Sequence, residues 1–367
     1  MAEAPFGRFF LPGPTEVRPE ILAAMARPMI PHRGEEASAL YRRIQEGLRP
    51  LFRTARPVYV SVSSATGMME AGLRALPSGR VLALVNGAFS ERFAKIAEAC
   101  GFSADVLAHS WGAVHDPTEV ARRLSEKRYG ALLVVHSETS TGALQPVAKL
   151  AAVARDAGAA ILVDAVSSLC ATPVLPDAWE LDYVLSSSQK ALALPPGIAF
   201  AVAGKSLLEK AAHAERRGLY LDLLDFEKCA ETQQPSFTPA LPLLYALDAQ
   251  LARIATETLE TRWNRHIEMA ARTWSWAEET EARVGVRLEV LAPPGFRSPS
   301  VTCLRLPPGF AGPRLVKAIA ARGFTVGLGY GPLRETTFRI GHMGDHTLRE
   351  LEGLLAACDQ ALAAEQK

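Results

Sequence analysis

Short apolar runs alternate with longer amphipathic stretches between residues 58 and 203. Within each run the apolar residues are consecutive, which is typical of strands buried on both faces of a mostly parallel sheet. The runs cover residues 58–62, 81–85, 104–107, 131–135, 160–163, 183–186 and 198–202. The stretches between them have helical apolar spacing and include residues 67–76, 91–100, 117–127 and 147–157. This alternation predicts a doubly wound α/β domain.

The pattern changes after residue 242. Residues 243–282 contain almost no glycine or proline and have helical apolar spacing, which predicts one long helix or two consecutive helices. Strand-like runs and helices then alternate at residues 286–290, 300–305, 312–322, 336–340 and 347–364. They predict a smaller α+β domain. We expect an N-terminal arm over residues 1–16, a large domain over 17–255 and a small C-terminal domain over 256–367.

Charge and cysteine content restrict the possible functions. The 367 residues carry 40 Lys and Arg against 39 Asp and Glu, so no basic surface for nucleic acid is expected. The five cysteines form no CxxC pair, which argues against a disulfide framework or a zinc site and favours a reducing compartment. The sequence also lacks a signal-peptide pattern and an apolar run long enough to span a bilayer. We expect a cytoplasmic protein with no membrane partner and no metal.

Two successive predicted strands are followed by residues with complementary chemistry. Asp164 closes the run at 160–163, and Lys190 follows the run at 183–186. Ligands of such sheets bind beyond the carboxyl ends of the strands, so both side chains are expected at one site. Alone, Asp164 is better explained as a helix N-cap and Lys190 as a surface charge. Together they provide the Schiff-base lysine and the acid for a pyridine nitrogen that pyridoxal 5′-phosphate (PLP) requires.

The sequence resembles the class V aminotransferases of fold type I, specifically the alanine–glyoxylate and serine–pyruvate aminotransferase group. The resemblance extends over residues 9–364 in the family's order, and two of its segments, Ser187-Ser-Gln-Lys-Ala-Leu192 and His136-Ser-Glu-Thr-Ser-Thr-Gly142, are quite specific. The other matching segments are Phe10-Leu-Pro-Gly-Pro14, Ser63-Ser-Ala-Thr-Gly-Met-Met-Glu70, Asn86-Gly-Ala-Phe-Ser-Glu-Arg92, Val163-Asp-Ala-Val-Ser-Ser168 and Phe338-Arg-Ile-Gly341. The resemblance implies a large domain with a mostly parallel doubly wound sheet and a small C-terminal α+β domain.

The resemblance implies a set of cofactor-binding residues in addition to Lys190 and Asp164. They are Ser64, Ala65 and Thr66 for the phosphate, Phe89 stacked on the ring, Thr139 at the phenolic oxygen, Gln189 beside the lysine, and Thr238. The phosphate segment joins a strand to a helix, where backbone N–H groups favour an anion. The family often has glycine at the position of Ala65, so either φ at Ala65 stays negative or the loop is slightly distorted. Thr238 would reach the PLP phosphate of a partner chain, which implies a homodimer with shared active sites.

The resemblance also implies where the substrate binds. Arg339 would hold the substrate α-carboxylate, because a guanidinium group matches a carboxylate through two parallel hydrogen bonds. Gly13 would lend backbone to the same side of the substrate. Residues 327–332, which precede Arg339, are interpreted either as a mobile closing loop or as a simple turn.

These assignments imply a PLP-dependent transaminase with its Schiff base on Lys190. It would move an amino group from a small amino acid (alanine, serine or similar) to a 2-oxo acid such as glyoxylate or pyruvate. Transamination of 2-aminoethylphosphonate or aspartate is an alternative. A cysteine desulfurase would need a nucleophilic cysteine on a mobile loop, whereas Cys303 lies in a strand pattern and Cys358 in a helix pattern. A catalytically silent relative of the fold is the remaining alternative, and the intact Lys190, Asp164 and Arg339 argue against it.

Overall fold

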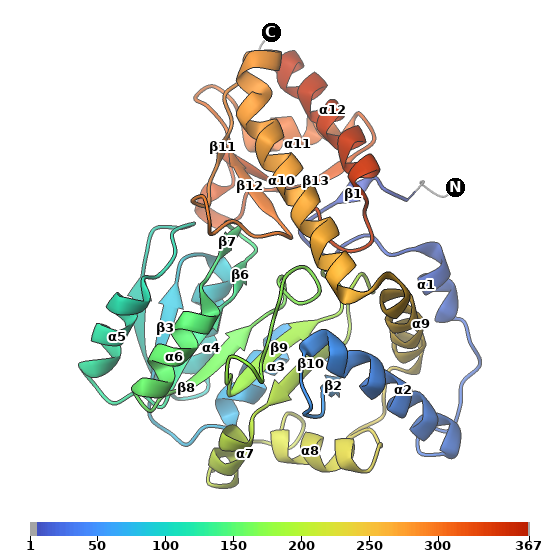
Figure 1. Cartoon of the computed structure of the whole chain (residues 1–367), viewed down its shortest axis with the longest axis vertical. Coiled ribbons are helices and arrows are strands. Elements are labelled where there is room, and N and C mark those ends of the chain that lie inside the picture. Colours follow the sequence, from blue (N-terminus) through green and yellow to red (C-terminus); the bar gives the residue numbers. More distant parts are fainter. Residues whose placement is uncertain (1–5, 366–367) are drawn as a thin grey trace.

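Two β-sheets organise residues 6–365, the part of the chain that the computed structural model describes. The larger has the order β2 (Tyr59–Ser61), β10 (Ala199–Ala203), β9 (Tyr183–Ser187), β8 (Ala160–Asp164), β5 (Ala131–Val135), β3 (Arg80–Val85) and β4 (Ser103–Ala108). The smaller has the order β1 (Phe9–Phe10), β13 (Thr325–Leu328), β14 (Thr337–Ile340), β12 (Thr302–Arg305) and β11 (Glu289–Val290). The smaller sheet lies at one end of the long axis of the molecule (Figure 1). Residues 1–5 of the predicted arm and 366–367 of the predicted small domain lie outside the described residues.

The larger sheet is mostly parallel, as predicted. Only β10 runs antiparallel to its two neighbours, β2 and β9. Strands β5, β8, β9 and β10 are buried at every position. The prediction that residues 104–107 are buried on both faces is wrong, because β4 is an edge strand whose residues are exposed or half-buried.

Helices cover both faces of the larger sheet because alternate strand residues point to opposite sides. Leu132 and Val134 of β5 pack on one face with α2 (Glu35–Phe52), α5 (Pro117–Ser125), α6 (Val147–Asp156) and α9 (Leu241–Glu257). Leu133 and Val135 pack on the other face with α3 (Ala65–Arg74), α4 (Ala88–Ala99), α7 (Lys205–Ala212) and α8 (Leu223–Glu231). The doubly wound architecture is therefore confirmed.

The C-terminal third of the chain packs around the smaller sheet. Its core is formed with α10 (Leu259–Val284), α11 (Gly312–Ala320) and α12 (Leu348–Glu365). The helical region predicted for residues 243–282 consists of two helices, α9 and α10, which meet at Thr258, a residue with φ of 69°. Strand β1 pairs in parallel with β13, so the N-terminal segment is part of the smaller sheet.

The remaining elements are short. They are α1 (Pro19–Ala24), the hairpin of β6 (Ser137–Glu138) and β7 (Ala143–Leu144), and a 3-10 turn, η1 (Gly331–Leu333). The segment interpreted as a loop or turn over residues 327–332 is partly regular, since its first two residues belong to β13. Over residues 6–365, no helix has both the length and the apolar character needed to cross a membrane.

Candidate active site

A cavity of about 330 Å³ lies at the carboxyl ends of β8 and β9. A volume of that size is typical of small-molecule and cofactor sites. The cavity brings together most of the residues predicted from the sequence: Gly13, Ser64, Ala65, Thr66, Phe89, Thr139, Asp164, Gln189 and Lys190. Arg339 adjoins its wall, and Thr238 lies elsewhere.

Lys190 lies in the turn that follows β9. Its Nζ donates a hydrogen bond to the carbonyl oxygen of Pro12 and lies 5.9 Å from the centre of the Phe89 ring. Burial, followed by the positive charge of Arg339, lowers the pKa of Lys190 to about 7. A substantial fraction of the amine is therefore uncharged near neutral pH, and the uncharged amine is the nucleophile that Schiff-base formation requires.

Asp164 is the last residue of β8 and is almost completely buried. Its Oδ1 accepts a hydrogen bond from the backbone N–H of Val166 at 2.8 Å. Burial raises the pKa of Asp164 to about 7, and the negative charge of Glu138 adds to that increase. A cationic ring nitrogen next to this carboxyl group would lower its pKa again and form a charge-assisted hydrogen bond.

The segment predicted to hold a phosphate forms the start of α3. Ser64 is the N-cap residue, and its side chain makes no capping hydrogen bond. Since the first N–H groups of a helix have no intrahelical acceptor, those of Ala65 and Thr66 are available to an anion at the cavity. Ala65 has helical backbone geometry and is not in the left-handed region, as expected for alanine in place of glycine.

Arg339 lies on β14 and is held against the cavity wall. Its Nη1 donates to the carbonyl oxygen of Thr139 at 3.0 Å, and its Nε donates to that of Leu328 at 2.9 Å. The centre of the Tyr330 ring lies 5.6 Å from its Cζ. A guanidinium group has five N–H donors, so these two bonds leave donors for a carboxylate.

Gly13 is packed against the lysine. Its φ is +107°, and a Cβ at this position would lie 2.5–2.6 Å from Cδ, Cε and Nζ of Lys190. Only glycine fits this contact without displacing the lysine side chain. The role that the structure gives directly to Gly13 is therefore to leave room for Lys190; a contact with substrate remains a prediction.

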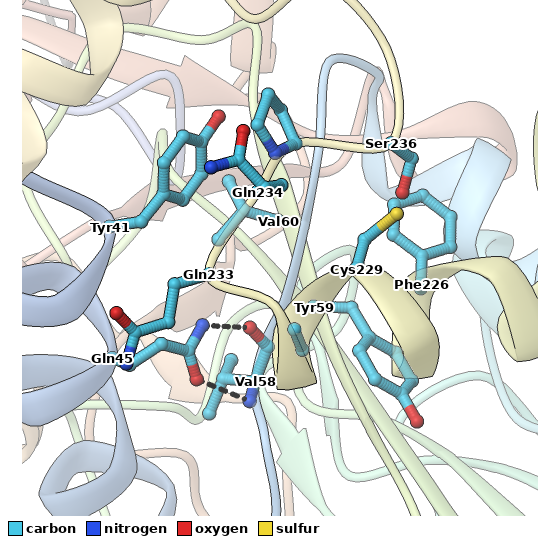
Figure 2. Close-up of a pocket in the computed structure, with 12 residues that line it drawn as sticks. Tyr41, Gln45, Val58, Tyr59, Val60, Phe226, Cys229, Gln233, Gln234 and Ser236 are labelled. Atoms are coloured by element: carbon cyan, nitrogen blue, oxygen red, sulfur yellow. Dashed lines mark hydrogen bonds between the residues drawn. The ribbon is translucent and has the colours of Figure 1, made fainter. Parts of the chain in front are cut away.

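Thr238 is exposed and lines a separate cavity of only about 20 Å³. A second cavity of about 30 Å³ is lined by residues 233–236 of the segment that leads to Thr238 (Figure 2). At this cavity the side-chain amide of Gln45 donates a hydrogen bond to the Val58 carbonyl oxygen and accepts one from the Val58 N–H group. Each space is large enough for about one or two water molecules. Gln234 ties the segment to Ser38 of α2. A single chain therefore does not join Thr238 to the main cavity.

Sequence reasoning missed Glu138. This side chain is fully buried and accepts hydrogen bonds from the backbone N–H groups of Phe89 (3.1 Å) and Ser90 (2.9 Å) and from the hydroxyl of Ser140 (2.6 Å). A Cβ on Gly87 would lie 2.5 Å from Glu138 Cγ, so glycine permits this approach. Glu138 thereby fixes the start of α4 and the position of Phe89. The sequence signal for Glu138 was an acidic residue within the specific segment 136–142.

Sequence reasoning also assigned no role to Arg92. It lies one turn after Phe89 on α4 and lines the cavity. Its Cζ lies 4.9 Å from the centre of the Phe89 ring. The predicted helix begins at residue 91, whereas α4 begins at Ala88, and only this earlier start places Phe89 and Arg92 three residues apart on one helix face.

The residues around the cavity fit PLP. An aromatic wall at Phe89, a carboxyl group at Asp164, an amine at Lys190 and the free N–H groups of α3 surround one space. They correspond to the ring, the ring nitrogen, the aldehyde and the phosphate of the cofactor.

None of the five cysteines, all of which fall within residues 6–365, lines this cavity. Cys303 is fully buried in β12 and Cys358 in α12. Burial raises the pKa of the Cys303 thiol to about 11. The cavity therefore has no cysteine nucleophile of the kind that a desulfurase requires.

Comparisons with known proteins agree with the geometry. The family model for aminotransferase class V matches residues 18–283. An uncharacterized aminotransferase of Methanocaldococcus jannaschii is 34% identical, with 96% of this chain and 91% of the relative covered. The structure of an alanine–glyoxylate aminotransferase from Nostoc sp. is 30% identical, with a TM-score of 0.91 over 98% of this chain and 96% of the other. A Thermus thermophilus aspartate aminotransferase of subgroup IV is 33% identical, with a TM-score of 0.88 over 97% and 99%.

Proposed function

The chain belongs to the class V aminotransferase family and is a PLP-dependent enzyme, and from this premise we propose which groups it transfers. The donor is a small amino acid such as alanine or serine, and the acceptor is a 2-oxo acid such as glyoxylate or pyruvate. The observation that carries this proposal is the convergence of Lys190 and Asp164 on one cavity, with Arg339 beside it.

Each residue has a defined task in this reaction. PLP, when bound, supplies an electrophilic carbonyl group and an electron sink for the negative charge that develops at the substrate Cα. Lys190 would hold the cofactor through Nζ, and the same Nζ, when free, would take the proton from the substrate Cα. Asp164 keeps the ring nitrogen protonated, and Arg339 orients the substrate through its α-carboxylate.

The surroundings of Lys190 and Asp164 support these tasks. A buried amine with a pKa near 7 can exist uncharged as a base and charged as an acid at neutral pH. The turn that carries Lys190 is held on both sides, since Thr15 N–H donates to the carbonyl oxygen of Gln189 (3.0 Å) and Arg262 Nη2 to that of Ala191 (2.7 Å). A held turn keeps Nζ aimed at the same point in both halves of the reaction.

The decisive experiment compares the wild type with Lys190→Ala. The wild type is expected to bind PLP covalently and to convert alanine and glyoxylate over many turnovers, whereas Lys190→Ala forms no covalent adduct and does not turn over. Lys149→Ala, a change at an exposed lysine of α6, is the control and keeps both properties. Multiple-turnover transamination by Lys190→Ala would disprove the assignment. The same transamination assay with serine, aspartate, phosphoserine or 2-aminoethylphosphonate in place of alanine identifies the preferred donor.

The proposal extends to a homodimer in which Thr238 of one chain contacts the PLP phosphate of the other. Its support is three exposed apolar side chains, Val62, Leu219 and Tyr220. Val62 lies three residues before α3, and its carbonyl oxygen accepts a hydrogen bond from the Tyr220 hydroxyl at 2.9 Å. Light scattering tests the dimer, and a weaker PLP affinity of Thr238→Ala tests the contact; a monomer with full activity would refute both.

We also propose a cytoplasmic location and the division into an arm (1–16), a large domain (17–255) and a small domain (256–367). The separate cores around the two sheets support this division.

A further inference from the structure

A second arginine, Arg92, stands at the cavity that contains Lys190. It lines this cavity from α4, whereas Arg339 approaches from the smaller sheet. Tyr330 lies next to both arginines: its hydroxyl is 3.5 Å from Arg92 Nη2, and its ring centre is 5.6 Å from Arg339 Cζ. Arg92 therefore lies on the side of the cavity where a substrate bound by Arg339 would be.

The charge of Arg92 has no carboxylate partner among residues 6–365. Its contacts there are the face of the Phe89 ring, whose centre is 4.9 Å from Cζ, and the Tyr330 hydroxyl, which is 3.5 Å from Nη2. A cation on an aromatic face is held in place without being neutralised. Most of its N–H donors are therefore free, and the half-buried side chain keeps them at the cavity.

The other charged groups of the site already have a hydrogen-bond partner or an assigned ligand group. Glu138 accepts hydrogen bonds from the N–H groups at the start of α4, and Asp164, which lines the cavity, is assigned to the ring nitrogen of PLP. The PLP phosphate is assigned to the start of α3 and the substrate α-carboxylate to Arg339. Arg92 is the positive charge left without an anion, although it faces the same space.

We propose that Arg92 binds a second anionic group of the substrate, on the carbon chain beyond Cα. Among small amino acids, the enzyme then prefers donors with an anionic side chain, such as a carboxylate one methylene away, over alanine and serine. This inference rests on the proposed transaminase function and narrows its substrate class. The recognised chemistry is the distal anion, which a carboxylate or a phosphonate can supply.

The test measures binding of unreactive substrate mimics to the PLP-loaded protein by calorimetry. Succinate carries two carboxylates, 3-phosphonopropionate carries a carboxylate and a phosphonate, and butyrate carries one carboxylate on a chain of similar length. The wild type is expected to bind one or both dianions at least about tenfold more tightly than butyrate, the change typical of one charge-assisted hydrogen bond. Preference for succinate or for the phosphonate identifies the natural anion.

Variants at α4 test the residue itself. Arg92→Gln is expected to lose the tenfold preference while its butyrate affinity stays within about twofold, and Arg92→Lys should recover part of the preference because it restores the charge. Lys95→Gln removes one positive charge from an exposed position on the same helix and should behave as the wild type. Steady-state kinetics should follow binding, with a higher KM for aspartate but not for alanine in Arg92→Gln.

Two results would overturn the inference. One is equal affinity of the wild type for dianions and butyrate. The other is an equal loss of affinity for every mimic in Arg92→Gln, which would mean that Arg92 only supports the Phe89 ring. Both are distinguishable from failure of the proposed function, which would appear as absence of the covalent PLP adduct at Lys190.

Discussion

Replacing Gly13 with alanine is expected to displace Lys190 and slow the reaction. The added Cβ would lie 2.5–2.6 Å from three atoms of the lysine side chain, whereas ordinary contact begins at 3.4 Å. The lysine must therefore move by about 1 Å, and a misplacement of that size at a reacting group costs about 10²-fold in rate. In addition, φ at Gly13 is +107°, and holding an L-residue at positive φ costs about 1–2 kcal/mol.

A matched control separates the displaced lysine from the backbone strain. Gly309 has a similar φ of +92°, but a Cβ there meets no atom within 4 Å. Gly309→Ala should lose about 1–2 kcal/mol of stability and keep its turnover. Gly13→Ala should lose at least as much stability and, in addition, most of its turnover.

The assay combines urea unfolding with kcat, KM and the yield of the covalent PLP adduct after borohydride reduction. For Gly13→Ala we expect a lower kcat and a lower adduct yield, because both depend on the position of Lys190 Nζ. If Gly13→Ala loses the same stability as Gly309→Ala but keeps the wild-type kcat and adduct yield, the argument that Gly13 makes room for the lysine is refuted.

Two further predictions concern buried carboxylates. Glu138→Gln places an amide group against the N–H donors at the start of α4 and should weaken PLP binding in absorbance titrations. Glu91→Gln on α4 is the control and should bind PLP as the wild type does. Equal PLP affinities of Glu138→Gln and the wild type would contradict the positioning of Phe89 by Glu138. Asp345→Asn breaks a buried ion pair with Arg262 (2.8 Å) and should cost about 3–5 kcal/mol in urea unfolding, whereas Glu352→Gln at a surface pair should cost less than about 1 kcal/mol. Burial alone would raise the pKa of Asp345, but Arg262, Arg253 and Gln250 together lower it below its usual value. This stability is therefore present above the unfolded-state pKa near 4 and is lost as pH falls through the lower folded-state value. A pH-independent difference between Asp345→Asn and wild type in acid would contradict this assignment.

The larger sheet could be predicted from the sequence because most of its strands contain a run of consecutive apolar residues. Residues 131–135 and 160–163 need no neighbour to be recognised, since burial on both faces leaves an uninterrupted apolar run. Strand β13 was missed because two of its four residues, Gly327 and the exposed Thr325, have no strand-like apolar pattern. Its pairing with β1 and β14, far away in the sequence, makes it a strand.

The site residues that could be predicted are those whose side-chain chemistry and place at a strand end both point to the cofactor. Asp164 ends one buried strand and Lys190 follows the next, and the carboxyl ends of parallel strands meet at one edge of the sheet. Glu138 was missed because its contact with Phe89 joins residues 49 positions apart in the sequence. Arg92 was missed because the predicted helix begins after Phe89, so sequence spacing shows neither the shared helix face nor that the charge of Arg92 lacks a partner.

The position of Lys190 relative to Arg339 depends on segments that join the two sheets. Asp345 lies five residues after the end of β14, the strand that carries Arg339. It forms a buried ion pair with Arg262 Nη1. The Nη2 group of Arg262 donates a hydrogen bond to the carbonyl oxygen of Ala191, the residue after Lys190. Pro12 lies two residues after β1, which pairs with the smaller sheet, and its carbonyl oxygen accepts a hydrogen bond from Lys190. A displacement of the smaller sheet would therefore move the groups that hold both ends of a bound substrate. For this reason the N-terminal segment and α10 belong to the catalytic geometry as much as the strand ends do.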